Sequence, residues 1–244
     1  MHAGQYTAAL KEFQKALNFS TDADEETAII HNNMGLALDR ESQFARAVKE
    51  FRAALEQGLD SVPFHLNFGM ALYHQHDFEA AIAEFQGVIE REPRNTIAYS
   101  DLMECYDKTK RYDEAIEAGQ TALKFAGDDP TLLNNLGLAL THKQRYDEAV
   151  NCYQLALKVN PNDALVFNNL GLAFYQQGKL PEAVKAYESA IALNPKSALT
   201  YENYGLALYD ANRHADAHAA WRKMIAVGDS EKIILGKHLL AQYP

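Results

Sequence analysis

Apolar and small residues return along this chain at a fixed interval of 34 residues. A glycine marks this interval in five places, and Met103 stands at the one equivalent position that has no glycine. Six consecutive repeats follow without insertions, at 28–61, 62–95, 96–129, 130–163, 164–197 and 198–231. The interval is marked by glycines separated by 34, 68, 34 and 34 residues: Gly35, Gly69, Gly137, Gly171 and Gly205. The twentieth position of every repeat is alanine: Ala47, Ala81, Ala115, Ala149, Ala183 and Ala217.

Each repeat carries two apolar stripes with the spacing of an α-helix. At about 100° per residue, positions 3, 4, 7, 8, 10 and 11 share one side of a first helix. In the fourth repeat they are Leu132, Leu133, Leu136, Gly137, Ala139 and Leu140. Positions 17, 20, 21, 24, 27 and 28 form a second stripe: Tyr146, Ala149, Val150, Tyr153, Ala156 and Leu157. Neither helix can bury its stripe alone, so the pattern predicts helix pairs that stack around one elongated core.

Turn residues separate these stripes twice in each repeat. Gly178 is placed to end a first helix, and Asp147-Glu148 is placed to open a second helix. Asn160-Pro161 and Asn194-Pro195 close second helices in the same way. A coiled coil is disfavoured because the apolar pattern is not a sustained heptad.

These residues match a known repeat signature. The succession Asn135-Leu136-Gly137, Tyr146-Asp147-Glu148-Ala149, Tyr153, Ala156 and Asn160-Pro161 resembles the tetratricopeptide repeat, as do its equivalents in the other repeats. The resemblance covers residues 28–231. It implies an all-α fold, namely a right-handed superhelical solenoid of stacked helix-turn-helix repeats. It also implies that the first helices line the concave face.

The two ends of the chain depart from the repeat. Residues 1–27 are expected to form a partial repeat and a linker, because residues 5–17 have only the spacing of a second helix. This end is expected either to lie inside a longer array or to be covered by self-association. Residues 232–244 are expected to form a capping helix that packs on the sixth repeat.

Positions 2, 5, 6, 9, 12 and 13 lie on the side of the first helix that stacking does not use. We expect a protein or peptide ligand to bind there. Position 6 is an amide in five repeats and a carboxyl in one: Asn33, Asn67, Asp101, Asn135, Asn169 and Asn203. An amide both donates and accepts hydrogen bonds, so this row can pair with the backbone of an extended ligand. The alternative is that the asparagines only order local structure.

Large apolar side chains accompany the amides on the same side. Position 9 contributes Leu138, Leu172 and Leu206, and position 12 contributes Tyr73, Tyr175 and Tyr209. An exposed apolar patch usually marks an interaction site, so these residues predict an extended or helical partner with apolar anchors. Two alternatives are that solenoid curvature buries part of the patch and that the chain's own terminus occupies it.

The third repeat differs most from the others. Asp101, Glu104 and Asp107 form an acidic patch that could receive a lysine or arginine of a partner, or could be a solvated face. Gly119 stands at position 24, where the other repeats have an aromatic residue. Losing that side chain and adding glycine to a helix predicts a soft point near Gly119.

Composition and residue chemistry exclude several other functions. The net charge of -10 disfavours nucleic-acid binding, and no stretch is apolar enough to insert into a membrane. Cys105 is expected in the core, Cys152 on the outer side of a second helix, and His74 and His76 in a solvated turn without metal. No catalytic constellation or cofactor motif stands out. A cytoplasmic location is favoured because the chain has no signal sequence.

The resemblance also brings one negative expectation. Tetratricopeptide proteins that capture the acidic C-termini of heat-shock chaperones use basic residues at positions 2, 5, 6 and 9. Position 2 here has no basic residue: Ile29, Pro63, Ile97, Thr131, Leu165 and Leu199. We therefore do not expect a chaperone tail as ligand.

Taken together, the sequence predicts a non-catalytic scaffold that binds a peptide segment or partner helix in its concave groove and organises a larger assembly. Two alternatives stay open. The chain could be a targeting or regulatory arm of a larger enzyme, or a structural protein that joins end to end through its N-terminal half-repeat.

Overall fold

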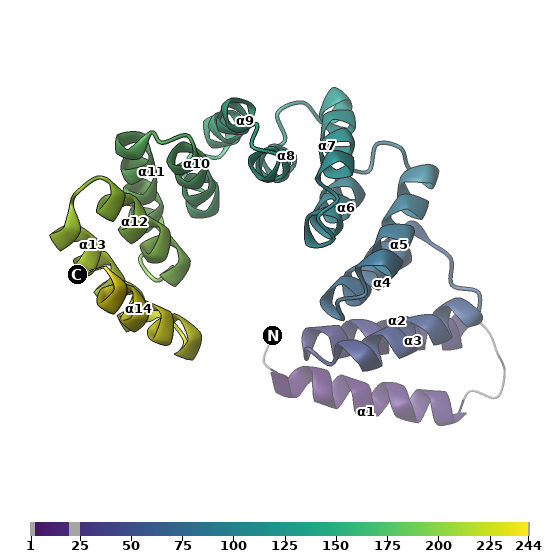
Figure 1. Ribbon diagram of the computed structural model, residues 1–244. Helices are drawn as coiled ribbons and strands as arrows, with labels where there is room; N and C mark the ends of the chain where they lie inside the picture. Colours follow the sequence, from purple (N-terminus) through teal and green to yellow (C-terminus); the bar gives the residue numbers. More distant parts are fainter. Residues whose placement is uncertain (1–2, 20–24, 244) are drawn as a thin grey trace. The chain divides into compact units, whose positions relative to one another are not determined.

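The computed structural model describes residues 3–19 and 25–243, and this part of the chain forms fourteen α-helices (Figure 1). The first helices of the repeats are α2 (Glu25–Arg40), α4 (Val62–His74), α6 (Thr96–Lys108), α8 (Pro130–His142), α10 (Ala164–Gln176) and α12 (Ala198–Asp210). The second helices are α3 (Phe44–Glu56), α5 (Phe78–Arg91), α7 (Tyr112–Ala126), α9 (Tyr146–Val159), α11 (Leu180–Leu193) and α13 (His214–Val227). Helix α1 (Ala3–Phe19) precedes these pairs, and α14 (Ser230–Gln242) follows them. The predicted all-α class is confirmed.

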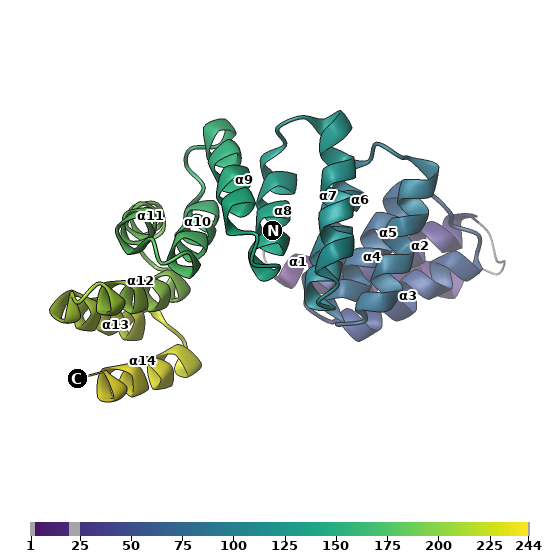
Figure 2. The same ribbon diagram turned by 45° about the horizontal axis from the view of Figure 1, so that its top comes forward.

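The helices pack in sequence order within two compact parts, residues 1–118 and residues 119–244 (Figure 2). We call these the N-terminal part and the C-terminal part and describe each by itself. The boundary between them falls inside α7, between Ala118 and Gly119. In five repeats the first helix packs on the second helix of the same repeat, as α8 does on α9 and α10 on α11. Within each part, second helices also pack on the next first helix, as α5 does on α6 and α9 on α10.

Most first helices begin at a side chain that caps backbone N–H groups. Asp129 Oδ1 accepts hydrogen bonds from the backbone nitrogens of Thr131 at 2.9 Å and Leu132 at 3.0 Å. Asp163 makes the same pair of bonds at the start of α10. The first four backbone N–H groups of a helix have no hydrogen-bond partner within the helix. A side chain that accepts from them therefore fixes where the helix starts.

The turn between first and second helix has the same backbone conformation in all six repeats. Its central residue, at position 15, has a φ between 59° and 75°: Ser42, His76, Lys110, Gln144, Gly178 and Asn212. In every repeat the N–H of position 16 donates to the carbonyl of position 11, as Arg145 does to Leu140 at 2.9 Å. This bond closes the helix end around a left-handed residue. Only Gly178 is a glycine, so the sequence marked this turn clearly in one repeat alone.

The glycine of position 8 lies under the aromatic ring of position 24 in the same repeat. A Cβ atom on Gly137 would lie 2.6 Å from Cε1 of Tyr153, and one on Gly35 would lie 2.9 Å from Cζ of Phe51. The ring of Phe51 also lies 6.0 Å from the ring of Phe64 in the next first helix. A ring at position 24 is therefore covered by two first helices. Five such rings are completely buried: Phe51, Phe85, Tyr153, Tyr187 and Trp221.

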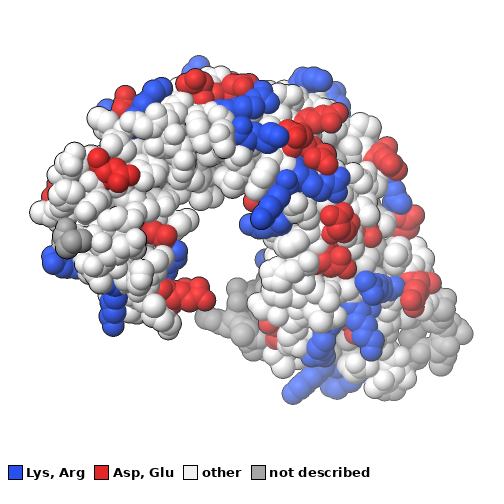
Figure 3. Space-filling view, viewed as in Figure 1, with Lys and Arg blue, Asp and Glu red and all other residues white. Residues whose placement is uncertain are grey.

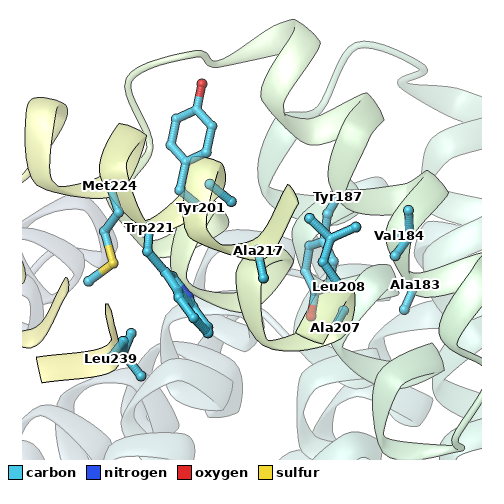
Figure 4. Close-up of a cluster of buried hydrophobic side chains, with 11 residues drawn as sticks. Ala183, Val184, Tyr187, Tyr201, Ala207, Leu208, Ala217, Trp221, Met224 and Leu239 are labelled. Carbon is cyan, nitrogen blue, oxygen red and sulfur yellow. The ribbon is translucent and has the colours of Figure 1, made fainter. Parts of the chain in front are cut away.

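Trp221 shows this packing in the core of the C-terminal part (Figure 4). Its side chain lies between Gly205 of α12 and the residues at the end of the chain, where Leu239 of α14 joins the same cluster. Met224 of α13 and Tyr187 of α11 belong to this cluster too. The cluster therefore joins α11, α12 and α13 to α14.

The third repeat has its large residue at position 8 and its small residue at position 24, the reverse of the other repeats. Met103 stands at position 8 and is 1% exposed, whereas Gly119 stands at position 24 and is also buried. The repeat therefore keeps one large and one small residue at these two positions, although their order is reversed. The two compact parts divide next to Gly119. The soft point expected there stays a prediction, which the hydrogen exchange of α7 tests.

The ends of the chain contain two helices without a complete repeat. Helix α1 packs on α2, and α14 packs on α13, where a Cβ on Gly236 would lie 2.5 Å from Cγ1 of Ile225. Helix α2 begins at Glu25 and α14 at Ser230, slightly before the predicted starts of the first repeat and of the cap. Residues 20–24 of the predicted linker, residues 1–2 and residue 244 lie outside the described residues. The predicted domain boundaries stay a prediction.

Candidate protein-interaction faces

The candidate binding side chains lie on the first helices of each part. In the C-terminal part α10 contacts both α8 and α12, so positions 2, 5, 6, 9 and 12 of these helices form one face. In the N-terminal part α4 contacts α2 and α6 in the same way. We call these the C-terminal face and the N-terminal face.

Five asparagines form a continuous hydrogen-bonded chain across the C-terminal face. Nδ2 of Asn203 donates to Oδ1 of Asn168 at 3.3 Å, and Nδ2 of Asn168 donates to Oδ1 of Asn169 at 3.4 Å. Nδ2 of Asn169 then donates to Oδ1 of Asn134 at 3.0 Å. Finally, Nδ2 of Asn134 donates to Oδ1 of Asn135 at 3.2 Å. The chain thus joins α12, α10 and α8 through their side chains alone.

This amide chain supports the alternative in which the asparagines order the structure between repeats. Asn168 is 4% exposed and Asn169 is 9% exposed, so their amides pair with one another instead of with water. An amide has two N–H groups, so Asn169 and Asn203 each keep a second N–H beyond the bond that each donates here. Binding of a ligand backbone by Asn135, Asn169 and Asn203 therefore stays a prediction.

Two apolar rows flank the amide chain. Leu138, Leu172 and Leu206, the predicted anchors at position 9, are all half-buried on one side of it. On the other side, Leu165 is 57% exposed and Leu199 is 47% exposed. Residues 165, 169 and 172 share one side of α10 because they follow the spacing i, i+4 and i+7.

The exposed row at position 2 is the part of the face that the sequence analysis did not propose as a site. Ile97 is 60% exposed and Ile29 is 44% exposed at the same position of the N-terminal face. A small pocket of about 90 Å³ opens between Leu165 and Leu199, and Asn168 reaches its wall. The signal was present in the sequence, because position 2 is apolar in five of six repeats.

The predicted tyrosines of the C-terminal face already have partners within the chain. The hydroxyl of Tyr175 donates to Oδ2 of Asp210 at 2.6 Å. Burial, together with Asp210, raises the pKa of Tyr175 to about 12. The ring of Tyr209 lies 4.8 Å from that of Tyr243, so a residue from the end of this chain occupies the anchor at Tyr209.

The N-terminal face is more acidic. Asn33, Asn67, Tyr73, Asp101 and Glu104 are all half-buried there. Burial raises the pKa of Asp101 to about 7, and the charge of Glu104 adds to this effect. Burial and then Glu104 raise the pKa of Tyr73 to about 12. These carboxyls are therefore less hydrated than a solvated face would be, and the role of Asp101 and Glu104 in binding stays a prediction.

The raised pKa of Asp101 predicts a pH-dependent stability. In the unfolded chain this carboxyl has its ordinary pKa of 3.8, so the folded state binds the proton more tightly. The free energy of unfolding therefore rises as the pH falls through about 7. Asp101→Asn, which installs the residue found at this position in the other five repeats, should raise the free energy of unfolding by on the order of 1 kcal/mol near pH 8. Near pH 5 the same substitution should change stability much less. Urea denaturation of both proteins at the two pH values measures the difference, and an equal effect at both would contradict the assignment.

Positions 4 and 23 of one repeat face each other, which corrects the expectation for Cys152. Nδ1 of His31 lies 2.7 Å from Oε2 of Glu50, and these residues stand at positions 4 and 23. Cys152, also at position 23, is accordingly 8% exposed and not on the outer side. Burial raises the pKa of Cys152 to about 11 and that of Cys105 to about 12, so both thiols are protonated at neutral pH.

The expectation of a solvated turn is wrong for His74. Its Nδ1 lies 2.8 Å from Oδ1 of Asp39, and its ring lies 5.1 Å from that of Phe44. The side chain of position 13 thus reaches back to the preceding repeat, whereas His76 is exposed. Among the described residues no group of three or more histidine, cysteine, aspartate and glutamate side chains is arranged to hold a metal ion.

Charge is distributed without one dominant basic area on the face that Figure 3 presents, where lysine and arginine are mixed with aspartate and glutamate. Oppositely charged side chains also form local pairs, such as Arg145 with Glu148 at 2.7 Å. Within residues 3–19 and 25–243, no helix combines the length and the apolar character needed to cross a membrane.

Solved structures with the same architecture include several tetratricopeptide proteins. A tetratricopeptide repeat protein from Parabacteroides merdae matches with a TM-score of 0.81 and 16% identity, over 98% of this chain and 92% of that chain. MamA matches with a TM-score of 0.58 and 21% identity, over 75% of this chain and 94% of that chain. The APC/C hetero-tetramer Cut9-Hcn1 matches with a TM-score of 0.75 and 18% identity, over 98% of this chain and 46% of that chain. At such identities these likenesses show the fold alone, and it is the tetratricopeptide fold.

Sequence comparison is more specific. No curated protein matches the chain significantly. Residues 1–203 match the family of the cilia and flagella-associated protein 70 C-terminal domain, a family of tetratricopeptide repeat domains and not a catalytic family. Tetratricopeptide domains generally mediate protein interactions. The match covers most of the chain, which therefore belongs to the cilia and flagella-associated protein 70 C-terminal domain family.

Proposed function

We propose that this chain is a non-catalytic scaffold of cilia or flagella that binds a segment of a partner protein on the faces of its first helices. The observation that carries the proposal is the row of exposed apolar side chains at position 2. Leu165 and Leu199 are both about half exposed and lie next to each other at the pocket between α10 and α12. Exposed apolar residues that gather in one place favour a protein partner.

The C-terminal face suits a segment with apolar anchors. Leu165 and Leu199 offer apolar surface on one side of the amide chain, and Leu172 and its equivalents offer it on the other. The pocket of about 90 Å³ has room for a small apolar side chain of the partner. Position 6 would contribute the second N–H groups of Asn169 and Asn203 to the ligand backbone.

The comparisons support the location and the kind of role. The matching family is named for cilia and flagella, which favours a partner in these organelles. One structural relative, Cut9-Hcn1, is a hetero-tetramer, so a protein of this fold takes part there in a larger assembly. On the N-terminal face, Asp101 and Glu104 would favour a partner segment that carries lysine or arginine.

Affinity capture from an extract of ciliated cells tests the proposal. The intact chain is compared with the double variant Leu165→Ser/Leu199→Ser, and the proteins retained by each are quantified. Loss of two exposed apolar anchors should weaken retention of a true partner by at least about tenfold. Because both leucines are exposed, the variant should unfold at nearly the same urea concentration as the parent.

Leu193→Ser is the matched control. Leu193 is 40% exposed at the end of α11, a second helix, and so is a leucine of similar exposure outside the proposed face. Its replacement should leave retention unchanged. Equal retention by all three proteins would show that the C-terminal face is not the binding surface.

A further inference from the structure

Helix α3 carries three basic side chains on the side that does not pack. Arg46, Lys49 and Arg52 stand at positions 19, 22 and 25 of the first repeat, and all three are exposed. The buried Ala47 and Phe51 face the opposite way. Residues three apart are neighbours on a helix surface, so the three side chains form one stripe about 9 Å long. We call it the α3 stripe.

No other second helix of the six repeats has such a stripe. At positions 19, 22 and 25 the other five second helices have either no basic residue or a single one, which is Lys185 in α11 and Arg222 in α13. The repeat pattern therefore does not require the three cations of α3. They also contrast with the chain as a whole, whose net charge is -10.

The positive charge of the α3 stripe is not neutralised within the described part of the chain. Several arginines elsewhere pair with carboxylates: Arg91, Arg111, Arg145 and Arg213. Within residues 3–19 and 25–243, Lys49 and Arg52 form no ion pair, and Arg46 donates to the neutral amide of Gln43. Like charges at this spacing destabilise a helix, so the stripe lowers the stability of α3 unless an opposite charge joins it.

The two carboxyls of α3 do not compensate the stripe. Glu50 and Glu56 lie one turn beyond Arg46 and Arg52, a spacing that allows an ion pair. However, Oε2 of Glu50 lies 2.7 Å from Nδ1 of His31 in α2, so this carboxylate is held toward the packed side. Glu56 is exposed and pairs with none of the described residues. The stripe is therefore available to an opposite charge on a partner.

Three cations in a row fit a protein segment that carries several carboxylates. A carboxylate can accept two parallel hydrogen bonds from arginine, and it attracts the compact charge of lysine. A stripe of about 9 Å matches about three residues of an extended segment. A nucleic-acid duplex or an anionic membrane reaches far beyond such a stripe, and the net charge of -10 would repel it. The stripe therefore favours a short acidic segment of a protein.

We propose that Arg46, Lys49 and Arg52 of α3 form a docking site for a short acidic segment of a partner protein. The carboxylates of the segment pair with the three cations and remove the repulsion between them. The site lies on a second helix, so it is separate from the faces of the first helices and adds a second interaction surface to the N-terminal part.

A synthetic peptide tests the α3 stripe. The probe is a fluorescently labelled hexaglutamate peptide, and its binding to the full chain is followed by fluorescence anisotropy. We expect saturable binding that weakens as the salt concentration rises, because salt screens exposed charges. A hexaglutamine peptide of the same length should bind at least about tenfold more weakly.

Two double variants with the same change in net charge locate the peptide. Lys49→Glu/Arg52→Glu reverses two charges of the α3 stripe and should weaken binding by at least about tenfold. Lys185→Glu/Arg222→Glu is the matched control, because these exposed residues are of the same types and stand at the same positions of α11 and α13. The control should weaken binding by no more than about twofold. In urea, Lys49→Glu/Arg52→Glu should be no less stable than the parent, because it removes like-charge repulsion within α3.

Four results would overturn the proposal. The first two are equal binding of the glutamate and glutamine peptides, and an equal loss of binding in both double variants, which would reflect net charge alone. The third is that a labelled DNA duplex or phosphatidylserine vesicles bind more tightly than the peptide and lose this binding in Lys49→Glu/Arg52→Glu, which would assign the stripe to another class of partner. The fourth is a loss of stability in that variant alone, which would mean that acidic residues of the chain itself occupy the stripe. The binding of a partner to Leu165 and Leu199 is not affected by any of these results.

Discussion

Gly137→Ala is expected to lower the free energy of unfolding by about 2 kcal/mol. The added Cβ atom would lie 2.6 Å from Cε1 and 2.8 Å from Cζ of Tyr153, whose ring is completely buried. The ring has little freedom to move, because its hydroxyl also lies 3.4 Å from Oγ1 of Thr141. Urea denaturation followed by circular dichroism measures the change.

Gly87→Ala is the control for this substitution. Gly87 lies inside α5, and a Cβ there would meet no atom within 4 Å. Alanine is the better helix former, so this variant should gain about 0.5–1 kcal/mol. Opposite signs for the two glycines are the expected result. If both substitutions stabilise the chain, the close approach of helix and ring at position 8 does not hold.

Trp221→Ala is expected to cost about 3–5 kcal/mol in the free energy of unfolding. Trp221 is completely buried, and its ring lies 6.1 Å from that of Tyr209 and 5.6 Å from that of Tyr243. Its removal leaves a cavity beside Gly205 and takes away the surface on which the end of the chain packs. Thermal and urea unfolding report the loss of stability, and hydrogen exchange of α14 should rise with it.

Trp221→Phe tests whether a smaller aromatic ring is sufficient at position 24 or whether the indole is needed. Two other repeats have phenylalanine at position 24, at Phe51 and Phe85, and both are completely buried under glycine. Phenylalanine should therefore be accepted at this position at a cost of about 1 kcal/mol. A loss as large as that of the alanine variant would mean that the indole makes a specific contact that a phenylalanine ring cannot replace.

Much of the fold could be predicted from the sequence because the same packing residues recur at the same positions of successive repeats. The glycine of position 8 and the ring of position 24 recur together, and the structure places one against the other, as at Gly137 and Tyr153. The fixed alanine of position 20 is buried in every repeat, as at Ala149. A helical wheel is sufficient for these contacts because they lie within one helix pair.

Contacts between repeats were harder to predict. The bond between Asn169 and Asn134 joins residues 35 positions apart, and the wheel of one helix does not show which neighbour an amide meets. His74 was expected in solvent for the same reason, although it reaches Asp39 of the preceding repeat. Cys152 was misplaced because position 23 lies at the edge of the second stripe, where a small rotation of the helix decides its burial.

The candidate site was predicted only in outline. The face was identified from the positions that stacking leaves free, and the half-buried Leu138, Leu172 and Leu206 lie on it. The strongest exposure, however, is at Leu165 and Leu199 of position 2. A helical wheel shows which side of a helix position 2 takes, but not how far the neighbouring repeat covers it.

Photo-cross-linking at residue 165 tests most directly whether the first helices hold the partner. A photoreactive amino acid is placed at position 165 or, as control, at position 193, and each protein is irradiated in an extract of ciliated cells. The account predicts a protein adduct at position 165 that the Leu199→Ser substitution reduces, and none at position 193. Adducts at position 193 alone would contradict it and would assign partner binding to the second helices.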